Sequence, residues 1–442
     1  MRPLPQIPDF VTFEHQVAQI LTQQEIHGWY FDERASWELE SALRKEFEET
    51  TQLLRDRHPF IGGPRFSPKR SNQRTGYVKI TGRIETHEHC GQPQAIEECS
   101  FTRLKELNPT SRDHITWILT TQYGWTPSLT SLKTKKPVID ETVLKDIGSD
   151  IALHFLRCLE LKKALGMISE GVNAWQKLVT TSSRIHHHCS VATNTFRCAH
   201  RKPNLAQVPS DERFRKLFTA SPNMVMVGAD LAGIELRVLS HYLARYDGGR
   251  YADILLNGDI HQVNADAIGI SRRAVKTVTY AFLYGAGDEK IGLSIDKQLS
   301  SDKAKAKGRK VRADFVAAIP GLSELLSAIK KRASDREIFA IDKRKVKVDS
   351  THKALNYLLQ CSAGIIAKRW MVIAHEMIKE VGIEAYQLAF VHDELQFECK
   401  PNYVNDLKFT LENSAIRAGE YYNMRIPIAA EAQSGKNWAE VH

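Results

Sequence analysis

The stretch Met224–Tyr242, MVMVGADLAGIELRVLSHY, sets the fold class. The first part is an apolar run that ends in a carboxylate, as a buried strand would, at Asp230. The residues that follow, from Gly233 onward, repeat their apolar positions with the period of a helix. The sequence therefore predicts that Asp230 lies at a junction between a strand and a helix.

A second apolar run with a central carboxylate is Tyr386–Cys399, YQLAFVHDELQFEC. Its two strand-like halves flank the tight turn His392-Asp393-Glu394, which predicts a hairpin with Asp393 at the tip. Between the two runs, helical patterns cover Ser240 to about Ala340 and Lys353–Val381. A sheet that carries two separated acids and is interrupted by a helical insertion indicates an α+β fold.

Two aspartates at strand ends suit divalent cations, because carboxylates held close together repel each other unless a cation lies between them. Phosphoryl transfer with two metal ions is the common use of such a pair. An isolated aspartate more often caps an element, so this alternative stays open for Asp230 and Asp393 taken singly.

The segment SRRAVKTVTYAFLYGAG carries a stripe of side chains at every fourth position. The stripe consists of Arg272, Lys276, Tyr280 and Tyr284. On a helix these side chains share one face, and the glycines at 285 and 287 end the helix. Two cations followed by two phenols can hold a triphosphate and offer a ring to a base.

The N-terminal part has a different sequence pattern. From Phe10 to about Leu54, helical spacing broken at Gly28 predicts two helices in a hairpin. The stretch Arg57–Arg83 has seven basic residues and no acidic one, so it is either a solvated loop or an insertion that contacts phosphates or docks a partner. Helical patterns then continue to about Thr180, where strands begin.

The composition bounds the class of protein. A chain of 442 residues with 42% hydrophobic and 26% charged residues is typical of a multidomain globular protein and argues against disorder or a coiled coil. No apolar run approaches a membrane span of ~20 residues and no signal peptide is evident, so we expect a soluble, cytosolic protein. The net charge of +9 weakly favours a polyanionic partner.

The seven cysteines are irregularly spaced and predict free thiols. Two groups contain candidate metal ligands: His87, His89, Cys90 and Cys99, and the run His186-His187-His188-Cys189. The first group has no paired CxxC, which favours a surface loop over a zinc site. The second lies in an alternating stretch that predicts a strand, so at most two of its three histidines can converge.

Three of these segments together resemble a known family. DLAGIELRVLSHY resembles motif A of the family A (DNA polymerase I type) DNA polymerases, RRAVKTVTYAFLYG resembles motif B, and VHDE is similar to motif C, in the right order. The stretches PNLAQVP, NGDIHQVNA, ALNYLLQ and NWAEVH are similar to replicative polymerases of short-tailed bacteriophages. The resemblance covers nearly the whole chain and is weakest from about Arg57 to Glu106.

The resemblance implies a right-handed polymerase with a helical thumb, a palm built on an antiparallel sheet, and helical fingers. The expected divisions are a thumb at 1–185 with a basic insertion at about 57–106, a palm at 186–245 and 350–442, and fingers at 246–349. The implied activity is template-directed addition of dNTPs to a primer 3′-hydroxyl by two-metal phosphoryl transfer. The implied setting is phage DNA replication in the cytoplasm of a bacterial host.

The family's functional residues carry over to matching positions. The metal ligands for two Mg²⁺ ions are Asp230, Asp393 and the carbonyl of Leu231, and the catalytic group is Asp230, Asp393, Glu394 and Lys276. The residues implied for dNTP binding are Arg272, Lys276, Tyr280, Tyr284, Glu235 and His261. Those implied for DNA binding are Arg197, Asn356, Gln360 and His392. Glu235 also excludes a 2′-hydroxyl and pairs with Tyr284, and His442 matches a C-terminal histidine near the active site.

Two departures accompany the resemblance. Thr195-Phe196-Arg197 stands where the family often has Thr-Gly-Arg, which puts the backbone path before Arg197 in doubt. Phage enzymes of this type usually begin with a 3′-5′ exonuclease domain, and this sequence starts at the expected thumb. We therefore expect any proofreading to come from a separate exonuclease chain or from a removed segment. A processivity factor, host thioredoxin or another, is expected to dock at the insertion.

Two other functions are compatible with part of this pattern. A single-subunit RNA polymerase shares the palm, but Glu235 argues against it because a carboxylate beneath the sugar leaves no room for a 2′-hydroxyl. A non-catalytic DNA-binding remnant would have lost Asp230, Asp393 or Lys276, and all three are present.

Overall fold

The computed structural model describes residues 8–66, 84–86, 101–127, 130–131, 134–296 and 299–442. The chain forms two compact units. Unit 1 comprises Met1–Ala35 with Trp175–His442, and unit 2 comprises Ser36–Ala174. In the described part of the chain, no helix is both long and apolar enough to cross a membrane.

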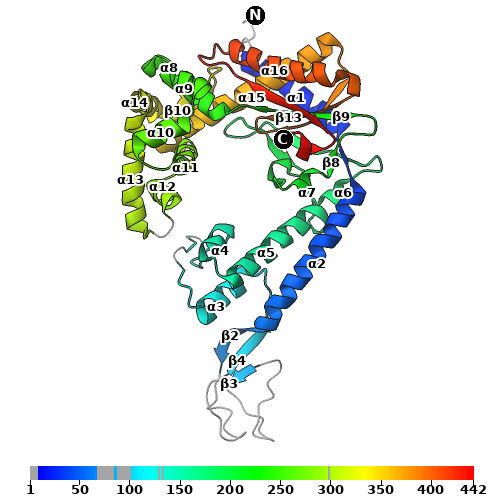
Figure 1. Ribbon diagram of the computed structural model, residues 1–442, viewed down its shortest axis with the longest axis vertical. Helices are drawn as coiled ribbons and strands as arrows, with labels where there is room; N and C mark the ends of the chain where they lie inside the picture. Colours follow the sequence, from blue (N-terminus) through cyan, green and yellow to red (C-terminus); the bar gives the residue numbers. More distant parts are fainter. Residues whose placement is uncertain (1–7, 67–83, 87–100, 128–129, 132–133, 297–298) are drawn as a thin grey trace, which may run out of the picture. The chain divides into compact units, whose positions relative to one another are not determined.

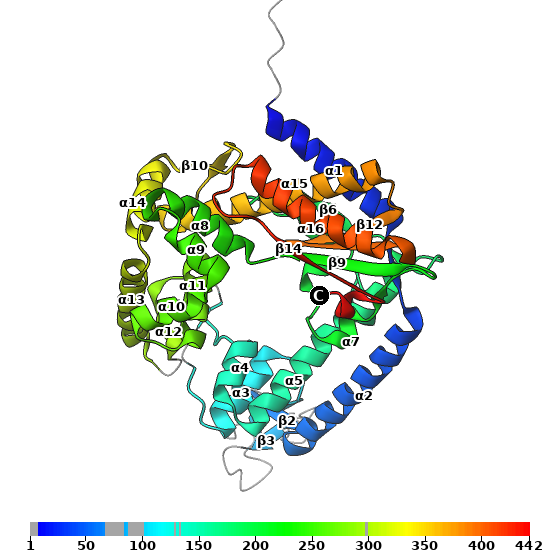
Figure 2. The ribbon, with the colours of Figure 1, turned by 45° about the horizontal axis from the view of Figure 1, so that its top comes forward.

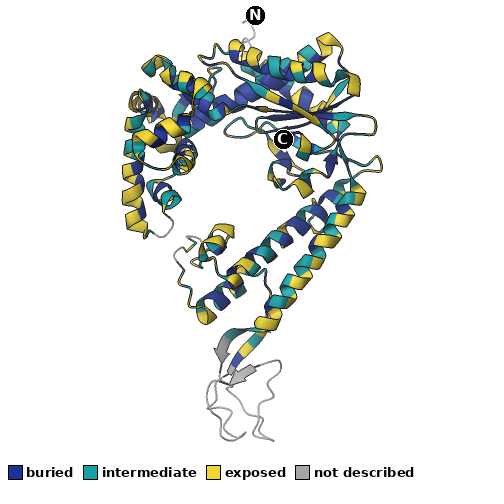
Figure 3. Ribbon diagram, in the orientation of Figure 1, coloured by how far each residue is buried: buried dark blue, intermediate teal, exposed yellow. Residues whose placement is uncertain are grey.

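The centre of unit 1 is an antiparallel sheet of four strands in the order β12-β13-β9-β14. The strands are β9 (Val225–Leu231), β12 (Ala385–Val391), β13 (Glu394–Cys399) and β14 (Ala430–Gly435). Three helices cover one face of this sheet (Figure 1): α1 (Asp9–His27), α15 (Ala354–Val381) and α16 (Val404–Tyr421). Much of α15 is buried (Figure 3) because it packs against both the sheet and its neighbouring helices.

Side-chain alternation divides β9 between the two faces of the sheet. Val227 and Ala229 belong to the apolar core with the covering helices, so Gly228 and Asp230 face the other way. At Gly228 a Cβ would lie 2.5 Å from the carbonyl oxygen of Val441. Glycine is required there because the C-terminal segment packs directly against the strand.

A smaller sheet lies in the same unit, in the order β5-β1-β8. Its strands are β1 (Trp29–Phe31), β5 (Arg184–Ile185) and β8 (Phe218–Thr219), and two short helices accompany it, α6 (Trp175–Leu178) and α7 (Glu212–Arg215). Buried aromatic rings hold this region together: Trp29 packs on Phe218 and Trp438, with centroid distances of 5.1 Å and 5.0 Å. A two-stranded ribbon, β6 (His188–Ser190) with β7 (Ala199–Arg201), also belongs to unit 1.

A group of helices forms the rest of unit 1 (Figure 2). They are α8 (Ile234–Asp247), α9 (Arg250–Asn257), α10 (Ile260–Ile268), α11 (Arg272–Leu283), α12 (Asp288–Ile295), α13 (Ser301–Ala318) and α14 (Leu322–Arg332), followed by the hairpin β10 (Glu337–Phe339) and β11 (Lys345–Lys347). Short 3₁₀ turns occur at Leu205–Gln207, Ala333–Asp335, Thr351–Lys353, Pro401–Tyr403 and Trp438–Glu440.

Unit 2 combines helices with a sheet in the order β2-β4-β3. Its helices are α2 (Glu33–Arg57), α3 (Arg112–Gln122), α4 (Glu141–Ile147) and α5 (Asp150–Leu165), the last extended by a π-helical turn at Gly166–Glu170. Its strands are β2 (Phe60–Phe66), β3 (Ile84–Thr86) and β4 (Phe101–Glu106). Its core includes Leu54, Ile115 and Phe155.

The structure confirms the main local predictions and corrects one. The strand-to-helix junction at Asp230 and the hairpin around Asp393 are present as predicted. The expected helical hairpin from Phe10 to Leu54 is wrong, because α1 packs on β12 and α15 in unit 1 whereas most of α2 belongs to unit 2. Of the expected thumb, 1–185, the segment Ser36–Ala174 forms unit 2, whereas its described N-terminal part and the stretch from Trp175 belong to unit 1.

Candidate active site

Strand pairing brings the two predicted aspartates together. In the β13/β9 register Glu394 lies opposite Asp230, and the backbone N–H of Leu231 donates to the carbonyl of Asp393 at 3.1 Å. The turn between β12 and β13 is tight because His392 adopts a left-handed backbone, with φ +58°. Both aspartates line a cavity of about 240 Å³, together with Leu205, Ala206, Val208, Arg215, Val391, His392, Glu394, Trp438 and His442.

Two negatively charged carboxylates without a cation between them are electrostatically unfavourable in this cavity. Partial burial, with repulsion from Asp393 and Glu394, raises the pKa of Asp230 to about 7, although the side chain reaches solvent at the cavity. Burial, with repulsion from Glu235, raises the pKa of Asp393 to about 6, against the opposing effect of Arg197. Within the described chain neither aspartate forms an ion pair, so a cation would relieve this repulsion.

Glu394 is held in place rather than left free. Its Oε1 accepts from the indole N–H of Trp438 at 2.6 Å and from the side-chain amide of Gln396. Its Oε2 lies 3.0 Å from His442 Nδ1, and this contact raises the pKa of His442. The C-terminal histidine thus lies at the cavity, as the resemblance implied, and Glu394 links it to the strand.

Glu235, in the first turn of α8, joins three segments. Its Oε1 accepts from Arg197 Nη2 at 2.6 Å and from the hydroxyl of Tyr284 at 3.1 Å. The pairing of Glu235 with Tyr284 is therefore present in the structure. Phe196, just before Arg197, has φ +58°, a conformation that glycine adopts without strain, so the substitution of glycine by phenylalanine is accommodated in a left-handed backbone.

The predicted cationic and aromatic stripe lies on α11. The helix starts at the N-cap Ser271, whose side chain accepts from Ala274 N, and ends before Gly285, where φ is +70°. Val275, Val278 and Phe282 are buried, which leaves Arg272 and Lys276 exposed on the opposite side.

Two residues of α10 and its cap adjoin this stripe. Arg272 Nε donates to Asp259 at 2.7 Å, and Asp259 also accepts from the backbone N–H of His261 as the N-cap of α10. The rings of His261 and Tyr280 lie 6.2 Å apart. His261 and the α11 stripe are therefore assembled as one surface, and Asp259 positions Arg272.

The residues expected on the template side lie on α15. The side-chain amide of Asn356 donates to the carbonyl of Leu283 at 3.0 Å, which ties α15 to the end of α11, and Gln360 follows one turn later. Among the described residues, neither is part of the lining of the 240 Å³ cavity. Their contacts with DNA, and the metal-ligating role of the Leu231 carbonyl, stay predictions.

Sequence reasoning missed two residues of the site. Asp259 lies within the stretch NGDIHQVNA, and nothing in the local sequence links it to Arg272. Arg215 lines the cavity, with its guanidinium 5.0 Å from the ring centroid of Trp438. It is one of many basic residues in the sequence, so no local signal singles it out. The candidate zinc ligands His87, His89, Cys90 and Cys99 lie outside the described residues.

The strand-end carboxylates at the cavity and the helix that carries Arg272, Lys276 and Tyr280 lie in the same unit, as expected for a polymerase palm and fingers. The comparisons specify which one. The family model for DNA polymerase family A matches residues 85–440. The chain belongs to DNA polymerase family A and is a DNA-directed DNA polymerase.

Individual relatives agree with this assignment. The DNA-directed DNA polymerases of Enterobacteria phage T3 and Escherichia phage T7 are each 32% identical over 510 aligned residues, covering 98% of this chain and 70% of the relative. DNA polymerase I of Pseudomonas aeruginosa is 25% identical, covering 72% of this chain and 36% of the relative. Among solved structures, the polymerase domain of Pol1 from M. smegmatis, in complex with DNA primer-template and dNTP, has a similar fold, with a TM-score of 0.74 and 19% identity, covering 97% of this chain and 70% of that one.

Proposed function

We propose that this polymerase extends a primer 3′-hydroxyl on a DNA template by two-metal phosphoryl transfer, with Asp230 and Asp393 as the metal-binding carboxylates. The observation that carries the proposal is the cavity in which these two side chains repel each other without an ion pair among the described residues. Their oxygen donors suit Mg²⁺, a hard cation. When bound, two such ions would offset the charge that develops on the attacking and leaving oxygens.

The chain's own cations complete the charge balance. Arg272 and Lys276 are exposed on one face of α11 and bind the triphosphate of the incoming nucleotide. Asp259 holds the Arg272 guanidinium before the nucleotide arrives, so Arg272 exchanges one anionic partner for another. His261, at the start of α10, approaches the same phosphates.

The sugar is selected by the group around Glu235. Its carboxylate, fixed by Arg197 and Tyr284, occupies the space that a 2′-hydroxyl would need. Because Arg197 is joined to Glu235, the residue that contacts the primer end also supports the selection of the sugar. Tyr280 lies on the same helix face, one turn before Tyr284, and faces the 3′ side of the sugar.

DNA and auxiliary proteins are the remaining partners. Arg197, Asn356, Gln360 and His392 contact the primer and template. Replication of a phage genome in the cytoplasm of a bacterial host is the proposed setting, and the named phage relatives support it. A processivity factor docks in the region 57–106, whose described part contains β2, β3 and β4.

Primer extension tests the proposal. The purified chain is given a 5′-labelled primer on a longer template, all four dNTPs and Mg²⁺, and products are resolved by length. We expect stepwise extension that needs both the template and the divalent cation. Products that do not follow the template would contradict the proposal. Scoring the same reactions for release of dNMP tests whether this chain proofreads.

A further inference from the structure

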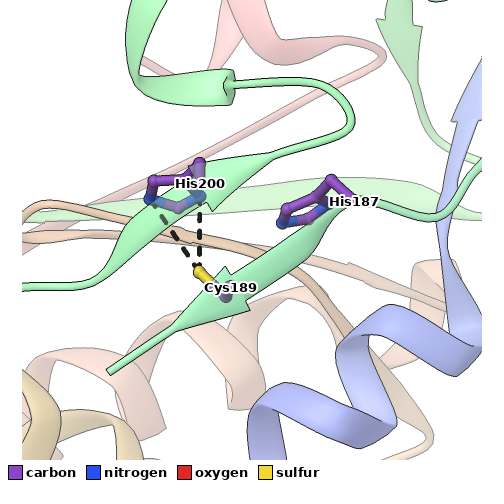
Figure 4. Close-up of side chains that lie close together, drawn as sticks. All are labelled: His187, Cys189 and His200. Carbon is purple, nitrogen blue, oxygen red and sulfur yellow. Dashed lines mark hydrogen bonds between the residues drawn. The ribbon is translucent and has the colours of Figure 1, made fainter. Parts of the chain in front are cut away.

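A second group of metal-ligating side chains, none of which lines the carboxylate cavity, lies at the ribbon of β6 and β7. Its members are His187, Cys189 and His200, whose side chains lie close together (Figure 4). All three are buried. One ligand atom from each lies within 4.8 Å of the ligand atoms of the other two. The closest approach is 3.3 Å, between Cys189 Sγ and His200 Nδ1.

The register of the ribbon explains why these residues meet. Cys189 pairs directly with His200 across the two strands, so their side chains share one face. His187 precedes Cys189 by two residues, and its ligand atom lies within 4.8 Å of those of Cys189 and His200. The thiol of Cys198 also interacts with that of Cys189.

The same alternation sends the other two histidines of the run elsewhere. His186 Nδ1 lies 2.7 Å from the carbonyl oxygen of Glu25, and His188 Nδ1 lies 2.8 Å from the carboxylate of Glu25. The expectation that at most two of the three histidines converge is therefore met, with His187 alone turned inward. His186 and His188 provide natural control positions.

One buried nitrogen atom of the cluster lacks a hydrogen-bond partner in the described part of the chain. His187 is fully buried, and its Nδ1 has no hydrogen-bond partner among the described residues. An unpaired buried polar atom is costly, and coordination to a cation would satisfy it. The other ring nitrogen, Nε2, lies 3.0 Å from the side-chain amide of Gln24, a buried residue of α1.

The amide pair behind His187 can adapt to a bound metal. The Gln24 oxygen accepts from the amide of Gln387 at 2.8 Å, and the Gln387 oxygen has no partner among the described residues. Flipping both side-chain amides exchanges their oxygen and nitrogen positions. Gln24 then accepts from His187 Nε2–H through its oxygen and donates through its nitrogen to the side-chain oxygen of Gln387. Histidine ligands of metals are usually oriented by such an acceptor on the second nitrogen.

We propose that His187, Cys189, Cys198 and His200 form a structural zinc site. Two imidazoles and two thiolates are a common ligand set for tetrahedral zinc. In that geometry neighbouring ligand atoms lie about 3.5 Å apart, so His187, Cys189 and His200 need to contract by only about 1 Å, whereas Cys198, which is outside this group of three, has to turn toward it. The proposal does not depend on the polymerase mechanism, because none of these residues belongs to the carboxylate site.

The location gives the site a role in holding the palm together. Cys189 Sγ lies 3.9 Å from the carbonyl oxygen of Phe390, three residues before Asp393 on the β12 side of the hairpin. Cys198 directly follows Arg197, which is bonded to Glu235. A metal in the ribbon would therefore fasten the chain on both sides of the active site.

Metal analysis of the purified chain tests the proposal. The protein is expressed without a histidine tag, purified without chelator, and analysed by plasma mass spectrometry. We expect about one zinc per chain, lost from Cys189→Ser and His187→Ala and retained by the double variant His186→Ala/His188→Ala. Gln24→Leu should weaken zinc binding by roughly tenfold or more, because the orienting acceptor is gone.

A spectroscopic readout separates this site from the carboxylates. Cobalt(II) added to the metal-free wild-type chain should give visible absorption of a tetrahedral centre with a thiolate charge-transfer band. That band should persist in Asp393→Ala and disappear in Cys189→Ser. Thermal unfolding of the wild-type chain with and without zinc gives a second measurement that needs no variant, and zinc should raise the midpoint.

Three results would overturn the proposal. The first is metal-free wild-type protein that also fails to bind added zinc or cobalt. The second is metal that is lost from the double variant, which would mark an adventitious ion on the surface histidines only. The third is a Cys189–Cys198 disulfide, seen as five titratable thiols instead of seven in the denatured chain.

Discussion

The two ends of strand β13 place carboxylates in opposite situations. Glu398 and Glu394 lie four residues apart on one strand and so project from the same face. Glu398 is 1% exposed but has many partners: His27 at 2.7 Å, Arg184 at 3.1 Å, and the backbone and hydroxyl of Ser221. Burial alone would raise the pKa of Glu398, yet these partners lower it to about 2.

The other end of the strand lacks such compensation. Asp393, which precedes the strand, and Asp230, on the neighbouring strand, have raised pKa values because burial and like charges dominate. The comparison shows that partners supplied by the chain distinguish Glu398 from the two aspartates. With such partners a carboxylate stabilises the fold, and without them it is available to bind a cation.

The largest expected effect is the loss of nucleotide incorporation on substitution of Asp230 or Asp393, the carboxylates without ion-pair partners among the described residues. Asp230→Ala and Asp393→Ala should each lower the rate of single-nucleotide incorporation by about a thousandfold or more, since each removes a metal ligand. Both variants should still fold and bind primed DNA. Rapid-quench measurement of one dNTP addition checks this, and Glu398→Gln serves as the matched control. A rate above about a tenth of wild type in either variant would contradict the metal assignment.

At the Glu398 end of the strand, where the carboxylate has partners, we expect substitution to change stability. Glu398→Gln should lower the free energy of unfolding by up to about 3 kcal/mol at about pH 7. Because folding lowers the pKa of Glu398, its contribution is full above the unfolded pKa and is lost as the pH falls toward about 2. The difference between wild type and variant should therefore shrink by about 1 kcal/mol at about pH 4. Denaturant titrations that show the same difference at both pH values would break the comparison.

A smaller effect concerns Tyr280, whose hydroxyl is the only feature that Tyr280→Phe removes. A dideoxynucleotide lacks the 3′-hydroxyl that bonds to its own phosphate, a loss of roughly 1 to 3 kcal/mol that a tyrosine hydroxyl can replace. We expect wild type to use ddTTP nearly as well as dTTP, and Tyr280→Phe to discriminate by about tenfold to a hundredfold. Equal kcat/KM ratios in the two proteins would eliminate this role of the hydroxyl.

The smallest expected change is at Glu235. This carboxylate lies near Asp393, but like Glu398 it has partners supplied by the chain, namely Arg197 and Tyr284. Glu235→Ala should raise ribonucleotide use relative to dNTP use by about tenfold and slow normal synthesis, because it opens space and frees both partners. Glu235→Gln keeps the bulk and is the control that should still reject ribonucleotides. Unchanged discrimination in Glu235→Ala would refute the steric role.

The sequence predicted the parts of this comparison that depend on local pattern. Asp230 and Asp393 were found from apolar runs that end in a carboxylate, and the α11 stripe from its four-residue spacing. The partners of Glu398 could not be predicted, because His27, Arg184 and Ser221 come from three distant segments. Alternation indicated that few of the adjacent histidines converge, but His200 lies on another strand, so only the pairing register brings it to Cys189. The family resemblance, not periodicity, indicated that Tyr284 pairs with Glu235.

The central claim is that carboxylates without partners bind the divalent cations and carboxylates with partners do not. The direct test counts bound Mn²⁺ by electron paramagnetic resonance in complexes with a dideoxy-terminated primer-template and the next dNTP, where no chemistry occurs. With zinc already supplied to every sample, we predict two Mn²⁺ ions in wild type and in Glu398→Gln, and a loss of protein-dependent Mn²⁺ binding in Asp393→Ala. Equal Mn²⁺ binding by Asp393→Ala and wild type would contradict the account.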